Sequence, residues 1–272
     1  MSGSKGYVNA AHGQLHYRRE GDGGKAVVLL HQAPSSSWMW EMVTPRLAAR
    51  GYDVVAFDLP GHGTSDSLPT EPSLQDYAGA IAQGTAELGL NEYAVVGHHT
   101  GCAVAMVLSV LHPDRVKAVV GWGIPRLAEP IRAVLAHEPP PEYDYNGTEI
   151  LNSWRAFWKE ATAESRPNAC VRSMAEMLQT GDKRAFAHRA VGRANFDELI
   201  AAMTVPMLAL AGSQEMLRKE TEAAARLSPL ITFSEFGDAG TYVADEQPDA
   251  FASAIDDFLR GAEFTPSKGI RW

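Results

Sequence analysis

The sequence predicts an α/β protein with a mostly parallel sheet that is covered by helices on both faces. Short, continuous apolar runs, such as AVVLL at 26–30 and DVVAFD at 53–58, are typical of strands buried on both sides. Helical stretches alternate with these runs along the chain. The composition, 45% hydrophobic and 21% charged, provides enough apolar material for the core of a globular domain.

Polarity patterns and turn residues give the expected order of elements. Alternating polarity at 6–9 and 14–19, on either side of AAHG, predicts a leading hairpin. The later strands are predicted where apolar runs are bounded by turn residues, at 26–30, 53–58, 93–97, 118–123, 206–212 and 231–236. The main helices are predicted at about 74–88, from 100 until just before Pro113, at about 216–227 and at 248–261.

Residues 125–193 interrupt this alternation. They contain the proline-rich stretch EPPPEYDY and aromatic-bearing helical stretches such as ILNSWRAFWKEAT, but no long apolar strand. The alternation resumes with FDELIAAM at 196–203. We therefore expect one core formed by 1–124 and 194–272, with a helical lid inserted at 125–193. The last residues, AEFTPSKGIRW, are expected to form a tail.

Charge and cysteine content narrow the classes of partner. The net charge of −9 and the isoelectric point near 5.5 argue against a general surface for nucleic acid or anionic membranes. The first residues include no long apolar run, so neither a secretion signal nor a membrane anchor is expected. Cys102 and Cys170 lie outside any metal-type spacing and are expected to be buried free thiols. A cytoplasmic protein with a small-molecule substrate is the resulting expectation, and a homodimer stays open.

Four motifs occur in an order and at spacings similar to those of the α/β-hydrolase superfamily. LLHQAPSSSWMW at 29–40 resembles the oxyanion loop, and FDLPGHGTSD at 57–66 resembles the turn after the fourth strand. VVGHHTGC at 95–102 resembles the nucleophile elbow. PMLALAGSQE and FGDAGTYVADEQPDAFASAIDDFL, at 206–215 and 236–259, resemble the segments that carry the acid and the histidine. The resemblance covers nearly the whole chain and implies a mainly parallel, eight-stranded α/β-hydrolase sheet with a helical lid.

The resemblance also assigns residues to the family's catalytic positions. The pattern Gly-x-nucleophile-x-Gly falls on Gly97 to Gly101 and places His99 at the nucleophile position. Glu215 takes the place of the acid, and Thr241 takes the place of the catalytic histidine. The usual nucleophile and the usual general base are both replaced. A Ser–His–acid mechanism in its ordinary form is therefore not expected.

A histidine at the elbow suggests another use of the same site. Its imidazole reaches further than a serine side chain, and Thr241 clears the volume where the usual imidazole would lie. We expect His99 and Glu215 to form a dyad in which the carboxylate fixes the tautomer of the imidazole. Direct attack by His99 ranks second, because the resulting acyl-imidazole is labile. Thr100 and Cys102 are weak alternatives, since one should point away from the cleft and the other into the core.

The part of the family site that stabilises an anion is expected to persist. The backbone N–H groups of Ala33 and Thr100 correspond to the two oxyanion donors. Gln32 stands where the family commonly has glycine, which changes the shape and polarity of the loop. His31 and Asp58 are expected to shape the loops around the site rather than to react.

A further set of residues is expected to border a substrate pocket. These residues are mostly aromatic side chains of the lid and of strand ends, although simple packing explains the lid aromatics equally well. The set comprises Gln32, His98, Trp38, Trp122, Tyr143, Trp154, Trp158 and Thr241. No cofactor is implied. No metal is expected either, because His31, His99 and Glu215 offer suitable ligand types without a ligand-spacing signature.

The sequence therefore favours an enzyme that uses acid–base chemistry on a small organic substrate. The reaction could be hydrolysis of an ester, lactone or C–C bond, or a lyase, isomerase, cyclisation or decarboxylation step. The alternative from another class is a catalytically decayed relative that binds a small ligand. A Ser–His enzyme whose site has been altered by engineering is a third alternative.

Overall fold

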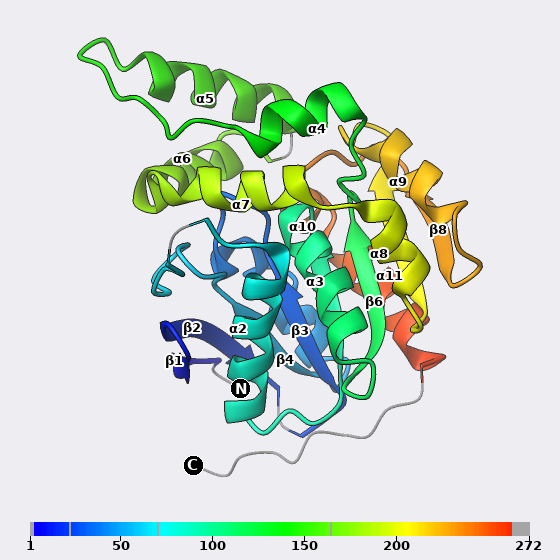
Figure 1. The fold of residues 1–272 in the computed structure, drawn as a ribbon. Coiled ribbons are helices and arrows are strands. Elements are labelled where there is room, and N and C mark those ends of the chain that lie inside the picture. The colour runs from blue at the N-terminus through cyan, green and yellow to red at the C-terminus, as the bar shows by residue number, and fades with distance from the viewer. Residues whose placement is uncertain (1–2, 22, 70, 164, 263–272) are drawn as a thin grey trace.

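An eight-stranded sheet forms the centre of the molecule (Figure 1). The computed structural model describes residues 3–21, 23–69, 71–163 and 165–262, so all of the expected tail beyond Ala262 lies outside the described residues. The strand order is β1-β2-β4-β3-β5-β6-β7-β8. β1 and β2 form an antiparallel hairpin, β2 is antiparallel to β4, and the other neighbouring pairs are parallel. The strands are β1 Ser4–Ala10, β2 Gly13–Glu20, β3 Ala26–Leu30, β4 Asp53–Phe57, β5 Tyr93–His98, β6 Val116–Trp122, β7 Met207–Gly212 and β8 Ile231–Phe236.

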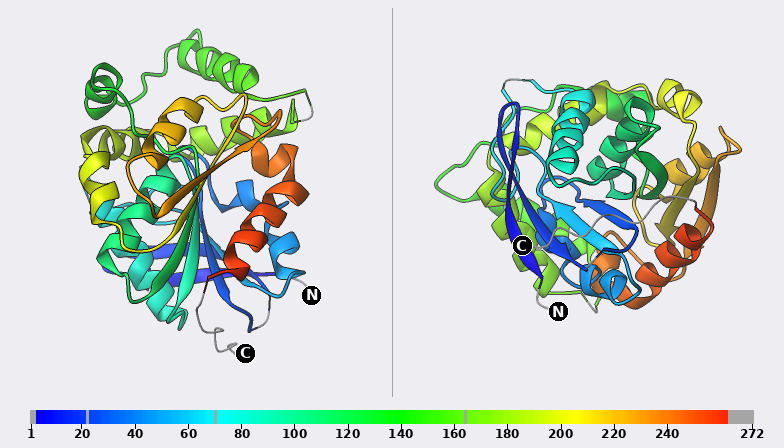
Figure 2. Two further views of the ribbon diagram at one scale, coloured as in Figure 1. Left: turned by 90° about the vertical axis from the view of Figure 1, so that its right-hand side faces the viewer. Right: turned by 90° about the horizontal axis from the view of Figure 1, so that it is seen from below.

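Helices cover both faces of the sheet, as Figure 2 shows. The helices that complete the core are η1 Ser37–Trp40, α1 Thr44–Ala48, α2 Leu74–Glu87, α3 Thr100–Leu111, α8 Phe196–Ala202, α9 Arg218–Ala225, α10 Val243–Glu246 and α11 Pro248–Arg260. Alternate residues of β3 enter two separate cores. Val28 belongs to the core shared with α2 and α3, and Val27 to the core shared with α1 and α11. Because neither face meets water, all five residues of β3 are apolar and buried.

Four helices are inserted between β6 and α8: α4 Glu129–Ala136, α5 Thr148–Glu160, α6 Asn168–Thr180 and α7 Lys183–Arg193. They lie over the end of the sheet at which the parallel strands finish (Figure 1). α6 and α7 carry several buried side chains, whereas no side chain of α5 is buried. α5 is therefore the outer layer of the insertion, and α6 and α7 separate it from the sheet.

The predicted α/β-hydrolase fold is confirmed, and β3 and β8 have the predicted limits to the residue. The structure adds η1, α1 and α10, which the sequence analysis did not predict. Each spans only four or five residues, too few to produce a helical periodicity. Among the described residues, no helix has both the length and the apolar character that crossing a membrane requires.

Candidate active site

His99 lies in a sharp turn between β5 and α3. Its φ of 44° and ψ of −106° are unusual for a residue with a side chain. Its N–H donates a hydrogen bond of 2.9 Å to the carbonyl of Trp122, which ties the turn to β6. Such a conformation persists only where the surrounding structure enforces it, and it is common at functional sites. The structure thus places His99 on the strained turn that the elbow motif predicts.

Glycines provide the space that this turn needs. A Cβ on Gly97 would lie 2.4 Å from the carbonyl oxygen of Gly101, so these residues let β5 and α3 approach closely. A Cβ on Gly123 would lie 2.4 Å from Cδ2 and 2.6 Å from Nε2 of His99. Gly123 therefore makes room for the imidazole itself. The sequence analysis missed it, although a glycine directly after the strand beside the elbow was a usable signal.

His99 and Glu215 form the predicted contact. Nε2 of His99 lies 2.8 Å from Oε1 of Glu215. Oε1 also accepts a hydrogen bond of 3.1 Å from the N–H of Leu217, and Oε2 accepts one of 2.8 Å from the indole N–H of Trp122. The Glu215 side chain is fully buried, and 13% of the His99 side chain is exposed. The carboxylate is thus held from two sides and presents one oxygen to the imidazole.

The charge state of Glu215 follows from these contacts. Burial alone would raise its pKa, but the charge and hydrogen bond of His99 outweigh burial and lower the pKa to about 2. An ionised carboxylate is only an acceptor, so the proton of this contact lies on Nε2 of His99. Nδ1 of His99 makes no hydrogen bond within the described residues. In the neutral form of the imidazole, this nitrogen carries the lone pair and can accept a proton.

His98 is buried beneath the site, where it holds the loop of Thr241 instead of lining a pocket. Its Nε2 lies 2.8 Å from the carbonyl oxygen of Thr241 and donates to it. Burial and the neighbouring His99 lower the pKa of His98 to about 3, so this imidazole is neutral. Neither side chain is accessible, with exposed fractions of 0% for His98 and 2% for Thr241. The expected pocket role is therefore wrong for His98, whose ring anchors the loop in which Thr241 replaces the family histidine.

The loop after β3 holds the peptide that carries the first expected oxyanion donor. Nδ1 of His31 donates to the carbonyl of Gln32 at 2.7 Å, and Nε2 of His31 accepts from the N–H of Leu59 at 2.8 Å. The N–H of Ser35 donates to the same carbonyl at 2.8 Å. Because a trans peptide is planar, fixing the Gln32 carbonyl also fixes the N–H of Ala33 on the opposite side. The N–H groups of Ala33 and Thr100 donate no hydrogen bond within the described part of the chain.

Several of the expected pocket residues lie elsewhere. Trp122 is fully buried and orients Glu215, so its role is to support the dyad. Trp38 is 41% exposed and donates to Glu41 on the outer surface, and Tyr143 is 47% exposed in the loop between α4 and α5. Neither occupies a pocket wall in this conformation. The expectation failed for these residues because aromatic content does not reveal whether a side chain faces the core, a pocket or the outer surface.

The outer helix α5 places its aromatic residues in two environments. Trp154 packs partly buried against a small core of Cys170 and Tyr242, and its ring lies 5.6 Å from that of Trp158. Trp158 is 40% exposed and lies under the guanidinium of Arg166. Of the expected aromatic residues of the insertion, Trp154 is therefore the one that faces inward.

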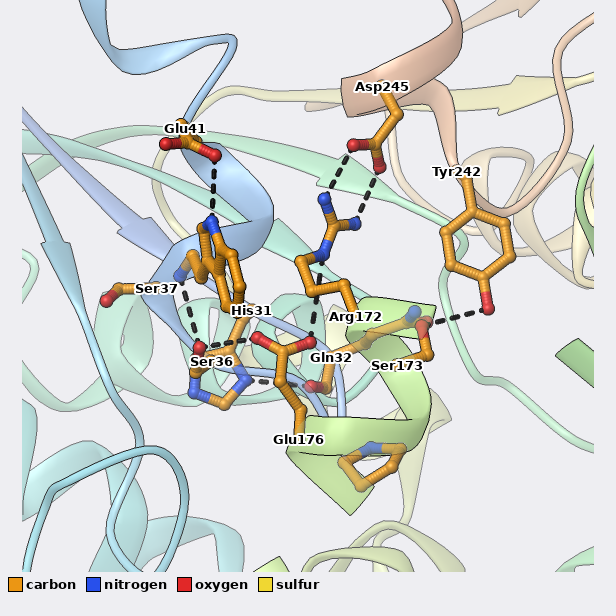
Figure 3. Close-up of polar contacts among 12 residues, drawn as sticks. His31, Gln32, Ser36, Ser37, Glu41, Arg172, Ser173, Glu176, Tyr242 and Asp245 are labelled. Atoms are coloured by element: carbon orange, nitrogen blue, oxygen red, sulfur yellow. Dashed lines mark hydrogen bonds and ion pairs between the residues drawn. The ribbon is translucent and has the colours of Figure 1, made fainter. Parts of the chain in front are cut away.

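Gln32, only 8% exposed, extends its side chain toward Ser173 of α6 (Figure 3).

Glu160, the last residue of α5, was not predicted as a site residue. Partial burial raises the pKa of its carboxyl, and the charges of His99 and Glu215 also act on it. Its backbone carbonyl lies close to Gly240, next to Thr241. The insertion thus contributes a second carboxyl group to the surroundings of the dyad. Only the tertiary contact of α5 with this loop could reveal it.

His98, His99 and Glu215 could also be considered as metal ligands. One donor atom from each lies within 4.8 Å of the others, and Nδ1 of His98 has no hydrogen-bond partner among the described residues. Two imidazoles and a carboxylate suit Zn²⁺, whose bonds of about 2.1 Å separate tetrahedral ligands by roughly 3.4 Å. The 2.8 Å between His99 and Glu215 instead matches a shared proton. The arrangement present is therefore that of a hydrogen-bonded dyad.

The chain is similar in sequence and fold to known proteins. A family model described as alpha/beta hydrolase fold matches residues 25–260. Epoxide hydrolase B of Mycobacterium tuberculosis is 38% identical over 104 residues, which cover 38% of this chain and only 29% of that protein. The enol-lactonase from Burkholderia xenovorans LB400 superposes with a TM-score of 0.79 at 21% identity, over 94% of this chain and 100% of that chain. Epoxide Hydrolase A from Mycobacterium thermoresistibile gives 0.78 at 23% identity, over 97% and 100%. These two structural matches show a shared fold.

Proposed function

This chain belongs to the α/β-hydrolase fold family, and from that premise we propose that it is an enzyme that acts on a small organic substrate through acid–base chemistry at His99 and Glu215. The observation that carries the proposal is the 2.8 Å contact between these side chains on the family's strained elbow. The similarity to epoxide hydrolases and an enol-lactonase supports a small electrophilic substrate.

In the proposed reaction, Nδ1 of His99 is the general base. Glu215 stays ionised and holds the proton on Nε2, so Nδ1 takes a proton from water or from a substrate O–H, N–H or activated C–H group. When water is the donor, its oxygen adds to the electrophilic carbon and the electron pair moves to the substrate oxygen. In this proposal the N–H groups of Ala33 and Thr100 stabilise the resulting anion. The electron pair then returns to reform the C=O bond, the bond between the carbon and the leaving group breaks, and the proton on Nδ1 of His99 passes to the leaving group.

This chemistry fits hydrolysis of an ester, a lactone or a C–C bond. Proton abstraction from the substrate itself would instead begin a lyase, isomerase or cyclisation step with the same residues. Hydrolysis is the preferred reaction, because the relatives named above are hydrolases by their names.

The inserted helices act as a lid in this proposal. Only 13% of the His99 side chain is exposed, and Gln32 and Thr241 are buried. A substrate larger than water therefore reaches Nδ1 only after the insertion moves. Such opening is a common requirement of enzymes that exclude water from their sites.

A substrate screen with a His99→Ala variant tests the proposal. Activated p-nitrophenyl esters and lactones are the first probes. We expect His99→Ala to lower kcat/KM by about 10²- to 10⁴-fold, the usual contribution of a general base. His12→Ala, a change at an exposed histidine, is the matched control and should retain full activity.

Two outcomes would reject this function. Unchanged turnover by His99→Ala would show that the dyad is not the base. Saturable ligand binding without turnover of any probe by the unmodified protein would favour the binding-protein alternative.

A further inference from the structure

Helix α6 lies across the two loops that border the dyad (Figure 3). Toward the loop after β3, Ser36 donates a hydrogen bond of 2.5 Å to Oε1 of Glu176, and Thr180 donates one of 3.2 Å to the carbonyl of Pro34. On the other side, the Arg172 guanidinium forms two bonds of 2.6 Å with Asp245 of α10, the short helix that follows the loop after β8. One helix of the insertion therefore holds both sides of the candidate site.

The contact with Ser36 reaches the expected oxyanion donor through the backbone. Oγ of Ser36 donates to Glu176 and at the same time accepts from the N–H of Trp38, at 3.2 Å, which caps η1. The next residue, Ser37, is held by the main domain and not by α6, because its N–H donates to Asp58 at 2.6 Å. Within the segment from Ala33 to Ser36, α6 thus contacts the Pro34 carbonyl and the Ser36 hydroxyl. Undocking of α6 removes both contacts together.

Glu176 is an unusual residue for such a contact, because it is only 3% exposed. Its Oε2 has no hydrogen-bond partner within the described part of the chain, and Nε of Arg172 lies 3.8 Å from it. Arg172 uses its terminal nitrogens to bind Asp245, so one guanidinium faces two carboxyl groups. From the core, the charge of Asp58 also disfavours ionisation of Glu176.

We propose that Glu176 is a positioning residue that couples docking of the insertion to the shape of the oxyanion loop. His31 and Ser35 hold the Gln32 carbonyl on one side of the Ala33 N–H, and α6 holds Pro34 and Ser36 on the other side, so that the loop takes its working shape only when α6 is closed over the site. This inference rests on the proposed function, since it takes the Ala33 N–H as an oxyanion donor. Closure then performs two tasks: it covers His99 and completes the anion-binding loop.

The contact is also sensitive to pH. Burial raises the pKa of Glu176 to about 7, against opposing effects of Ser36 and Arg172. A docked carboxyl therefore holds its proton more tightly than an undocked one in water. Rising pH removes this proton and leaves a buried charge, so docking weakens as the pH rises toward about 7.

Two substitutions at Glu176 separate hydrogen bonding from charge. Glu176→Gln keeps an Oε1 acceptor for Ser36 but cannot ionise, whereas Glu176→Ala removes the contact. The matched control is Glu41→Gln, which alters an exposed carboxylate of the same segment that accepts from Trp38. Hydrogen–deuterium exchange of the peptides that cover 32–38 reports the loop without requiring any substrate.

We expect Glu176→Ala to speed exchange in 32–38 by about tenfold, the factor that corresponds to one buried hydrogen bond. It should lower kcat more than it raises KM. Glu176→Gln should retain protection and lose its pH dependence around neutrality, and Glu41→Gln should match the unmodified protein. If Glu176→Ala does not fold, Thr180→Val gives a second measurement, because it removes only the bond to Pro34.

Exchange in 32–38 that is equal in the unmodified protein, in Glu176→Ala and in Thr180→Val, at all pH values, would overturn the coupling. Failure of this coupling can be distinguished from failure of the proposed function. Faster exchange in these variants together with an active His99→Ala variant would reject the dyad alone. Unchanged exchange together with an inactive His99→Ala variant would reject the coupling alone.

Discussion

His99 and Glu215 meet at 2.8 Å although 116 positions separate them in the chain. The imidazole comes from the elbow after β5, and the carboxylate from the turn after β7. In this protein the elbow residue itself provides the imidazole that pairs with the acid. This contact is the basis of the proposed proton-transfer reaction at His99 and Glu215.

Replacing Glu215 by Gln should reduce activity while leaving the fold intact. The amide cannot hold the proton on Nε2 of His99 as a carboxylate does, so the tautomer with a free Nδ1 loses its support. We expect kcat to fall by about 10²-fold or more. Trp122→Phe, which removes the hydrogen bond to Oε2 only, should cause a smaller loss. Full activity of Glu215→Gln in steady-state kinetics would exclude the carboxylate from the reaction.

Gly123→Ala should disable the dyad by crowding. The added Cβ would lie 2.4 Å from the imidazole, so His99 must turn away from Glu215. Gly89→Ala is the matched control, because Gly89 has a similar φ of 70° and a Cβ added there would have no atom within 4 Å. Both variants carry backbone strain, but only Gly123→Ala should lose activity. Equal activities would show that the imidazole does not need this space.

Glu176→Gln should change the pH dependence of stability. The unmodified carboxyl has a pKa of about 7 in the folded protein and near 4.5 in an unfolded chain. The folded state thus binds more protons between these values, and its stability relative to the Gln variant falls as the pH rises from about 4.5 to about 7. The difference amounts to at most about 3 kcal/mol. Thermal unfolding of both proteins across this range measures it, and parallel curves would contradict the assignment.

The pKa of Glu215 is shifted in the opposite direction from that of Glu176. Its pKa is lowered from 4.5 to about 2, so its ion pair adds stability above pH 4.5 that is lost as the pH falls through about 2. Unfolding of Glu215→Gln should therefore depend less on pH in this acid range than unfolding of the unmodified protein. Identical acid profiles would mean that the pair does not form in solution.

A chelator should leave the activity unchanged, because the dyad needs no ion. Added Zn²⁺ should inhibit, since binding at His98, His99 and Glu215 would displace the proton on Nε2 of His99. Activity after dialysis, with the metal content of the same samples, measures both effects. Activity that disappears on chelation and returns with one equivalent of metal would instead assign this donor set to catalysis.

The fold could be predicted from the amino-acid sequence because the signals for its strands are local. Strands buried on both faces must be continuous apolar runs, so AVVLL at 26–30 is recognisable without any neighbour. The elbow glycines likewise mark a turn that only small residues permit, which placed His99 at its apex. Glu215 was assigned through the resemblance to the α/β-hydrolase superfamily, whose acid lies three residues past the glycine that closes this strand. The resemblance could name these residues because their motifs are short and contiguous in the sequence.

The surroundings of His99 and Glu215 could not be predicted, because they depend on how distant segments pack together. Gly123, Glu160 and Glu176 act through contacts with segments distant in the chain, and no local pattern reveals such partners. Trp122 was expected beside the substrate but supports Glu215, since the pairing of β6 with β7 determines where its indole lies. The docking of four inserted helices selects which of their side chains face inward. That choice depends on packing between elements, which sequence periodicity within each helix does not specify.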